Sequence, residues 1–204
     1  MLQKIAIFFF FLSSFWASAQ NEQLAFNYID AGEYEKAITI LEEVYTKNKQ
    51  LYLDKLLYCY QQLQQYDKAL KFINELKSNN NNISLLVEEG YIFQLQKKQT
   101  EADKKYQDAI NEIDKNASYA YNLGSIFERK VLLEWALKAY EKGQKSNPNL
   151  NFDYQTAMIQ GQLGNLEIML NKLLDYGFAT PDGTPMVQNQ LTRFLMDDTD
   201  GSFA

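Results

Sequence analysis

The stretch NLGSIFERKVLLEWALKAYEKGQKSNP, residues 122–148, decides the fold of this chain. Gly124 stands twelve positions before a second small residue, Ala136, and the bulky Tyr140 follows four positions later. Residues at these spacings fall on the facing sides of two successive helices. Pro148 then ends the second helix, because proline donates no backbone hydrogen bond and restricts the residue before it. The stretch predicts one helix–turn–helix.

The same pattern recurs along the chain at a nearly constant interval. Ala37, Ala69, Ala102 and Ala136 stand 32, 33 and 34 residues apart, and a bulky residue follows each by four positions. We number each repeat so that this alanine is position 20. Position 8 is then mostly small, and position 11 is aromatic in four repeats, as Tyr28, Tyr60, Phe93 and Phe127. A fixed period of this length indicates a repeat array.

These positions resemble the tetratricopeptide repeat (TPR), and the match is best over residues 25–37 (AFNYIDAGEYEKA) and 122–148. The resemblance implies an all-α, right-handed α-α superhelix, a solenoid of about five helix–turn–helix repeats plus a C-terminal helix. The array is expected over residues 20–182, with repeats near 18–49, 50–82, 83–116, 117–149 and 150–182. The alanines at position 20 are called the ladder alanines below. The fifth repeat is degenerate, because Met169 stands at this position.

Three features interrupt the regular pattern. Glu89 occupies an apolar position, so either its side chain snorkels or the third repeat is shifted by one residue. The polar run over residues 77–82 and the Gly/Pro-rich run over residues 177–185 are predicted to be loops. A capping helix over residues 187–196 and a polar tail are expected within 183–204. This helix either caps the array or is the first helix of a sixth repeat.

The first 19 residues are predicted to be a secretory signal peptide. Lys4 precedes an apolar run over residues 5–12, and Ala17-Ser18-Ala19 forms an A-x-A cleavage site. Cleavage near Ala19–Gln20 would leave an exported chain, periplasmic or secreted, with no integral membrane segment. The alternative is an N-terminal anchor that is never cleaved.

Composition excludes several classes of function. The net charge of −6 opposes nucleic-acid binding, which requires a basic surface. The chain has no histidine, so no histidine-based catalytic triad or metal site is possible. Cys59 is the single cysteine and is expected to be a buried structural thiol. The sequence over residues 198–201 (DTDG) is only part of a calcium loop. We therefore predict no enzyme activity, no metal and no cofactor.

The candidate binding residues lie on the first helices of the repeats, which line a concave groove in the solenoid that the resemblance implies. The chain has 14 Tyr and 13 Phe, and several tyrosines fall at the groove positions. Tyrosine offers a large contact area with a polar tip, and glutamine can bond a peptide backbone. The alternative is that these rings pack against neighbouring helices. The candidate groove residues are Phe26, Tyr58, Gln61, Tyr91, Gln94, Tyr121, Arg129 and Tyr154.

The predicted function is a non-catalytic protein-interaction scaffold of the bacterial cell envelope, binding a peptide or partner segment in the groove. The alternative is a module that binds a glycan or small ligand in an envelope-associated complex. TPR proteins that clamp an acidic C-terminal tail use Lys and Asn where this chain has Glu22, Phe26, Asp54 and Tyr58. A neutral or basic protein partner is therefore expected.

Overall fold

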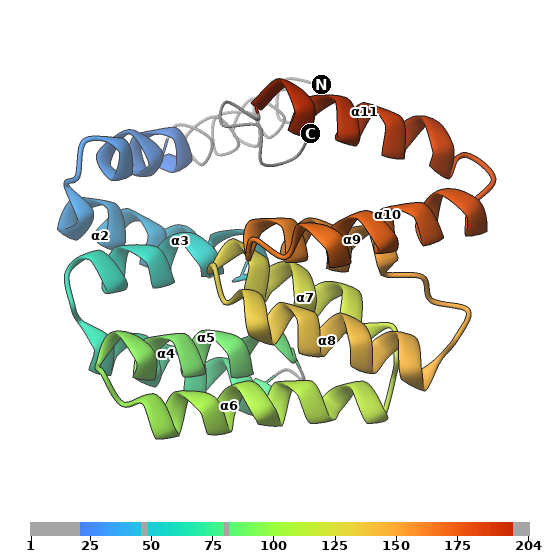
Figure 1. Cartoon of the computed structure of the whole chain (residues 1–204). Coiled ribbons are helices and arrows are strands. Elements are labelled where there is room, and N and C mark those ends of the chain that lie inside the picture. The colour runs from blue at the N-terminus through green and yellow to red at the C-terminus, as the bar shows by residue number, and fades with distance from the viewer. Residues whose placement is uncertain (1–20, 46–48, 80–81, 198–204) are drawn as a thin grey trace, which may run out of the picture. The chain divides into compact units, whose positions relative to one another are not determined.

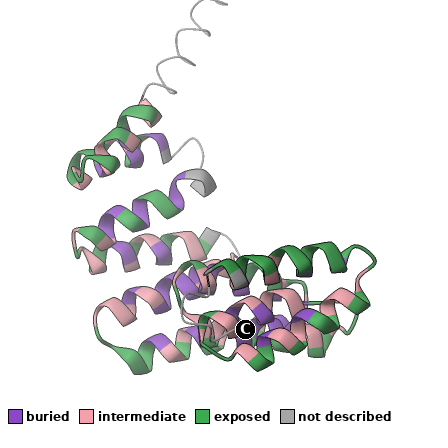
Figure 2. Cartoon of the chain, turned by 45° about the horizontal axis from the view of Figure 1, so that its top comes forward, coloured by how far each residue is buried: buried purple, intermediate pink, exposed green. Residues whose placement is uncertain are grey.

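The computed structural model describes residues 21–45, 49–79 and 82–197 (Figure 1). Every regular element in these ranges is a helix, which confirms the all-α repeat class. In Figure 2 buried and exposed residues alternate along the helices, as amphipathic helices packed on one side require. The chain divides into two compact units, Met1–Asn80 and Asn81–Ala204. The predicted signal peptide lies outside the described residues.

The N-terminal unit is built from short antiparallel helices. A helix over residues 21–30 is followed by α2 (Tyr34–Tyr45), α3 (Lys49–Gln62) and α4 (Tyr66–Asn79). Helix α3 packs against both α2 and α4. The ladder residues Ala37 and Ala69 are fully buried, and Cys59 is buried as expected.

The C-terminal unit contains three helix pairs and a final helix. Its elements are α5 (Ser84–Leu95), α6 (Gln99–Asn111), η1 (Glu112–Asp114), α7 (Tyr119–Arg129), α8 (Leu133–Ser146), α9 (Asp153–Gln162), α10 (Leu166–Ala179) and α11 (Gly183–Asp197). Helices α5 and α6, α7 and α8, and α9 and α10 form the pairs, and α11 packs on α10. Ala102, Ala136 and Met169 are fully buried where the two helices of each pair meet.

All five helix pairs share one turn, centred on position 15 of the repeat. The residue there has a positive φ in each case: Gly32, Gln64, Lys97, Val131 and Gly164. The amide of position 16 donates to the carbonyl of position 11, as in Leu132 N to Phe127 O at 2.9 Å. The amide of position 15 donates to position 12, as in Val131 N to Glu128 O at 2.9 Å. These two backbone hydrogen bonds together form the Schellman motif, which ends a helix.

Two loops are shorter than the sequence predicted. Helix α4 continues to Asn79, into the expected polar loop, and only residues 180–182 separate α10 from α11. The final helix begins at Gly183 rather than at Val187, so Pro185 lies in its first turn. Proline is tolerated there because the first amides of a helix have no intrahelical acceptor. Pro185 is therefore a helical residue, and the prediction that it lies in a loop is wrong.

The turn geometry predicts that Val131→Gly stabilises the protein. Val131 has φ 56°, and its side chain is 74% exposed, so the substitution removes backbone strain with little loss of burial. We expect a gain of about 1 kcal/mol in the free energy of unfolding, measured by urea titration. The matched control is Gly164→Val, which adds the same strain at φ 81° in open space and is expected to lose stability. A loss of stability in Val131→Gly would contradict this account.

Candidate functional site

The eight candidate residues all lie on first helices but belong to two compact units. Phe26, Tyr58 and Gln61 form the N-terminal candidate face. The C-terminal candidate face consists of Tyr91, Gln94, Tyr121, Arg129 and Tyr154, contributed by α5, α7 and α9. Each face is described within its own unit.

Aromatic rings and a lysine meet on the N-terminal face. Tyr58 is 42% exposed, and its ring meets that of Tyr34 edge to face, with the centroids 5.9 Å apart. A hydrogen bond to Tyr58 is the main cause that raises the pKa of Tyr34. Lys55 Nζ lies 5.3 Å from the centroid of the half-buried Phe26 ring, within the range of a cation–π contact. The face therefore combines exposed tyrosine with a positive charge.

Tyr121 and Arg129 are the most accessible residues of the C-terminal face. Tyr121 on α7 is 60% exposed. Arg129 is exposed two turns further along α7, and its Nη1 donates to Ser125 Oγ at 3.1 Å. Tyr121, Ser125 and Glu128 follow one another at helical spacing and thus share one side of α7.

Tyr91 and Tyr154 are engaged within the fold. Lys130 Nζ lies 4.3 Å from the centroid of the Tyr91 ring and 2.9 Å from Glu88 Oε2. Tyr154 packs its ring against Tyr176 of α10, with 5.4 Å between centroids. These two tyrosines are half-buried and therefore match the alternative that groove-facing rings pack against their neighbours.

The structure resolves the question of Glu89. Its side chain is buried in register, and its Oε1 lies 2.9 Å from Lys105 Nζ of α6. Gly90 directly after it faces Tyr106, which excludes a one-residue shift of the third repeat. A buried carboxylate requires such a partner. Lys105, sixteen residues later, carries no sequence signal that would have identified it as that partner.

Glycine at position 8 makes room for a tyrosine at position 24. A Cβ added to Gly90 would lie 2.5 Å from the Tyr106 ring, and one added to Gly124 would lie 2.4 Å from the Tyr140 ring. In the other three repeats position 8 carries a side chain and position 24 is aliphatic: Ala25 with Leu41, Leu57 with Ile73, and Ala157 with Leu173. The two glycines at position 8 therefore accommodate a ring, in addition to allowing close helix packing.

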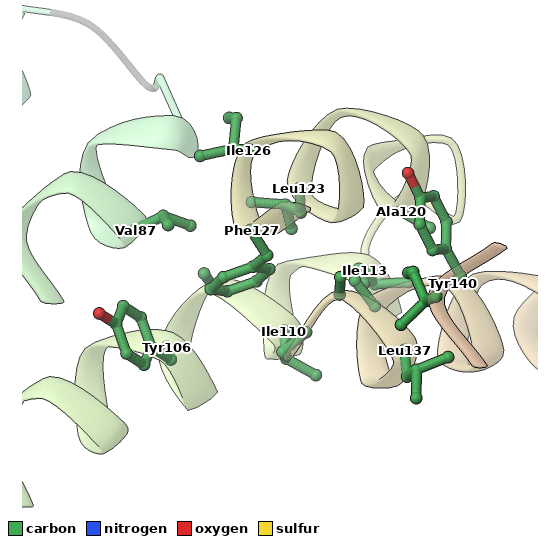
Figure 3. Close-up of a cluster of buried hydrophobic side chains, with 14 of the residues drawn as sticks. Val87, Tyr106, Ile110, Ile113, Ala120, Leu123, Ile126, Phe127, Leu137 and Tyr140 are labelled. Atoms are coloured by element: carbon green, nitrogen blue, oxygen red, sulfur yellow. The ribbon is translucent and has the colours of Figure 1, made fainter. Parts of the chain in front are cut away.

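The hydroxyls of the same two tyrosines form hydrogen bonds with side chains of the first helices. Tyr106 and Tyr140 belong to the buried hydrophobic cluster shown in Figure 3. The hydroxyl of Tyr106 donates to Gln94 Oε1 at 3.0 Å, and that of Tyr140 donates to Glu128 Oε1 at 2.5 Å. Gln94 and Glu128 both occupy position 12, one turn after the glycine. One oxygen of each side chain is thereby committed to the core.

Burial keeps these hydroxyls protonated. It is the main cause that raises the pKa of Tyr106 and Tyr140 above the ordinary tyrosine range, and for Tyr140 the bond to Glu128 adds to it. Burial also raises the pKa of the Cys59 thiol to about 11, so the reactive thiolate is disfavoured near neutral pH.

Nothing in the described part of the chain assembles a metal site. Within residues 21–45, 49–79 and 82–197, no three acidic or cysteine side chains cluster as metal ligands. No helix within those ranges has the length and apolarity to cross a bilayer. The partial calcium-loop sequence at 198–201 lies outside them.

No protein-family model and no curated protein matches the chain. Several solved structures are similar in fold. MamA (residues 41 to the end) from Desulfovibrio magneticus RS-1 is 16% identical, with TM-score 0.40, over 78% of this chain and 92% of that one. YrrB, a TPR protein with an unusual peptide-binding site, is 15% identical, with TM-score 0.40, over 84% and 89%. A tetratricopeptide repeat protein from Parabacteroides merdae is 15% identical, with TM-score 0.41, over 88% and 77%. The repeat fold rests on the chain's own helix pairs and recurring turns.

The contact of Gly124 with Tyr140 predicts a compensating pair of substitutions. Gly124→Ala alone places a methyl group against the buried ring and is expected to cost about 1–3 kcal/mol. Adding Tyr140→Leu recreates the Ala/Leu pair found in the first and fifth repeats, and is expected to recover part of that loss. Urea unfolding of both single variants and the double variant measures the coupling. Additive losses would contradict the complementarity.

The buried tyrosines predict that stability falls at alkaline pH. Unfolded tyrosine loses its proton near pH 10, whereas Tyr106 and Tyr140 retain theirs in the native state. The unfolded state then binds fewer protons, so the free energy of unfolding declines as the pH rises above about 10. The decline should be smaller in Tyr106→Phe/Tyr140→Phe, measured by urea titration at several pH values. Cys59→Ala serves as the control that separates the thiol's contribution, and equal slopes in all three proteins would refute the assignment.

Proposed function

We propose that the chain is a non-catalytic protein-interaction scaffold that binds an extended peptide or partner segment on the first-helix faces of its repeats. The exposure of Tyr121 is the observation that carries this proposal. A tyrosine that is 60% exposed on a structured helix contributes little to the core. Tyrosine is enriched among the residues that dominate binding energy at protein interfaces.

The surroundings of Tyr121 support a protein partner. Ser125 and Arg129 supply polar groups one and two turns along the same helix, respectively, and Gln94 and Glu128 remain half-exposed at position 12. An exposed aromatic ring bordered by hydrogen-bonding side chains resembles the centre of a protein interface more than an enclosed ligand pocket. With a net charge of −6, the chain favours a neutral or basic partner.

The proposal also places the protein in the cell envelope, after export. The support is the N-terminal sequence, in which an apolar run over residues 5–12 precedes the A-x-A site at 17–19. N-terminal sequencing of the protein recovered from its host tests this part independently of the binding proposal. A mature N-terminus near Gln20 is expected.

A comparison of two aromatic-to-alanine variants tests the binding proposal. In this experiment the wild-type protein is used to capture a partner from envelope extract, and the partner is then purified. Calorimetry is expected to show that Tyr121→Ala weakens binding of that partner about tenfold, or about 1.4 kcal/mol. Phe178→Ala is the control, because Phe178 is 87% exposed but lies on α10, a second helix. Equal binding by wild type and Tyr121→Ala, or capture of glycan in place of protein, would overturn the proposal.

A further inference from the structure

Gln94 and Glu128 occupy equivalent places in consecutive repeats. Each stands at position 12 of a first helix, one turn after a glycine, and each receives a hydrogen bond from the tyrosine at position 24 of its own repeat. Helices α5 and α7, which carry them, pack against each other. The two side chains therefore stand at equivalent places on neighbouring first helices.

The tyrosine hydroxyls determine which atom of each side chain is left to a ligand. Tyr106 and Tyr140 are almost wholly buried and approach from the second helices. Each hydroxyl donates a hydrogen bond to the Oε1 atom of its partner. The outward atom of Gln94 is therefore Nε2, a donor, and the outward atom of Glu128 is Oε2, an acceptor. No hydrogen bond from either outward atom to another described residue is recorded in the structure.

The spacing of neighbouring packed helices fits an extended polypeptide. Packed helices lie about 8–10 Å apart, and an extended chain rises about 3.3 Å per residue, so about three residues span equivalent places on two such helices. A peptide backbone presents carbonyl acceptors and amide donors along one edge at such intervals. A donor followed by an acceptor is the complement of that pattern.

We infer that Gln94 and Glu128 bind the backbone of an extended peptide, Gln94 donating to a carbonyl and Glu128 accepting from an amide, and that Tyr106 and Tyr140 fix this polarity from beneath. The inference rests on the proposed function and specifies its chemistry. Tyr106 and Tyr140 are positioning residues, since they act through the two side chains and touch no ligand. Position 24 is aliphatic in the other three repeats, so this device belongs to the third and fourth repeats alone.

Ester-substituted peptides test the acceptor. Twelve-residue peptides are selected from a random display library on the wild-type protein, and one binder sensitive to Tyr121→Ala is synthesised. Each backbone amide is then replaced in turn by an ester, which removes one N–H donor. One ester position is expected to weaken binding to wild type about tenfold, the loss of a hydrogen bond to a charged group.

The variants identify the residue responsible for that ester effect. Glu128→Gln turns the outward acceptor into a donor, so the sensitive ester should weaken binding less than twofold. Tyr140→Phe keeps the ring over Gly124 but releases Glu128, and the position-specific effect should shrink there too. A purely structural role of Tyr140 would weaken all peptides by the same factor. The matched control is Glu134→Gln, an exposed carboxylate on the second helix α8, which should leave the ester profile unchanged.

A second substitution tests the donor. Gln94→Glu replaces the outward amide by a carboxylate oxygen while keeping an acceptor for Tyr106, and is expected to weaken the parent peptide at least tenfold by repelling its carbonyl. Identical ester profiles in wild type, Glu128→Gln and Tyr140→Phe, or unchanged affinity in Gln94→Glu, would overturn the inference. Failure to select any peptide sensitive to Tyr121→Ala would instead overturn the proposed function.

Discussion

Close packing of the two helices within each repeat is the constraint on which this structure depends. The ladder alanines at position 20 are fully buried, so a larger residue there needs extra room on the facing helix, as Met169 of the fifth repeat has against Gly161. The size of the residue at position 8, on the first helix, then depends on the residue at position 24 of the second helix. Gly90 and Gly124 face tyrosine rings, whereas the repeats with Ala25 and Ala157 at position 8 carry leucine at position 24. The total volume between the helices is thus shared between two positions sixteen residues apart.

This packing also governs the turns. All five helix pairs close with the same Schellman hydrogen bonds and a left-handed residue at position 15. Only Gly32 and Gly164 adopt this conformation without strain, and Gln64, Lys97 and Val131 are held in it. The burial of two helices against each other outweighs a local cost of about 1–2 kcal/mol at each non-glycine turn. The turn follows from the pairing of the helices rather than from the turn residue.

The buried tyrosines connect the core to the candidate binding face. Their rings fill the space above glycine, and their hydroxyls, kept protonated by burial, end at the side chains of position 12. Two other candidate groove residues make contacts within the fold. The Tyr91 ring contacts Lys130, and the Tyr154 ring contacts Tyr176. On the C-terminal unit, what remains for a partner is a small set around Tyr121 and Arg129, together with the outward atoms of Gln94 and Glu128.

The sequence by itself determined the all-α repeat class, the helix pairing and the buried ladder, because a period of 32 to 34 residues and a 3.6-residue spacing are visible along one chain. It also placed the candidate residues on first helices, although their role in binding remains a prediction. It could not reveal the partner of Glu89, the early start of α11 or the strained turns at Gln64, Lys97 and Val131. Only the tertiary structure decided which groove side chains are occupied and which atom of Gln94 or Glu128 faces outward. Those outcomes depend on an aromatic ring or a charged group contributed by another helix. The position of that group cannot be read from the sequence pattern of a single helix.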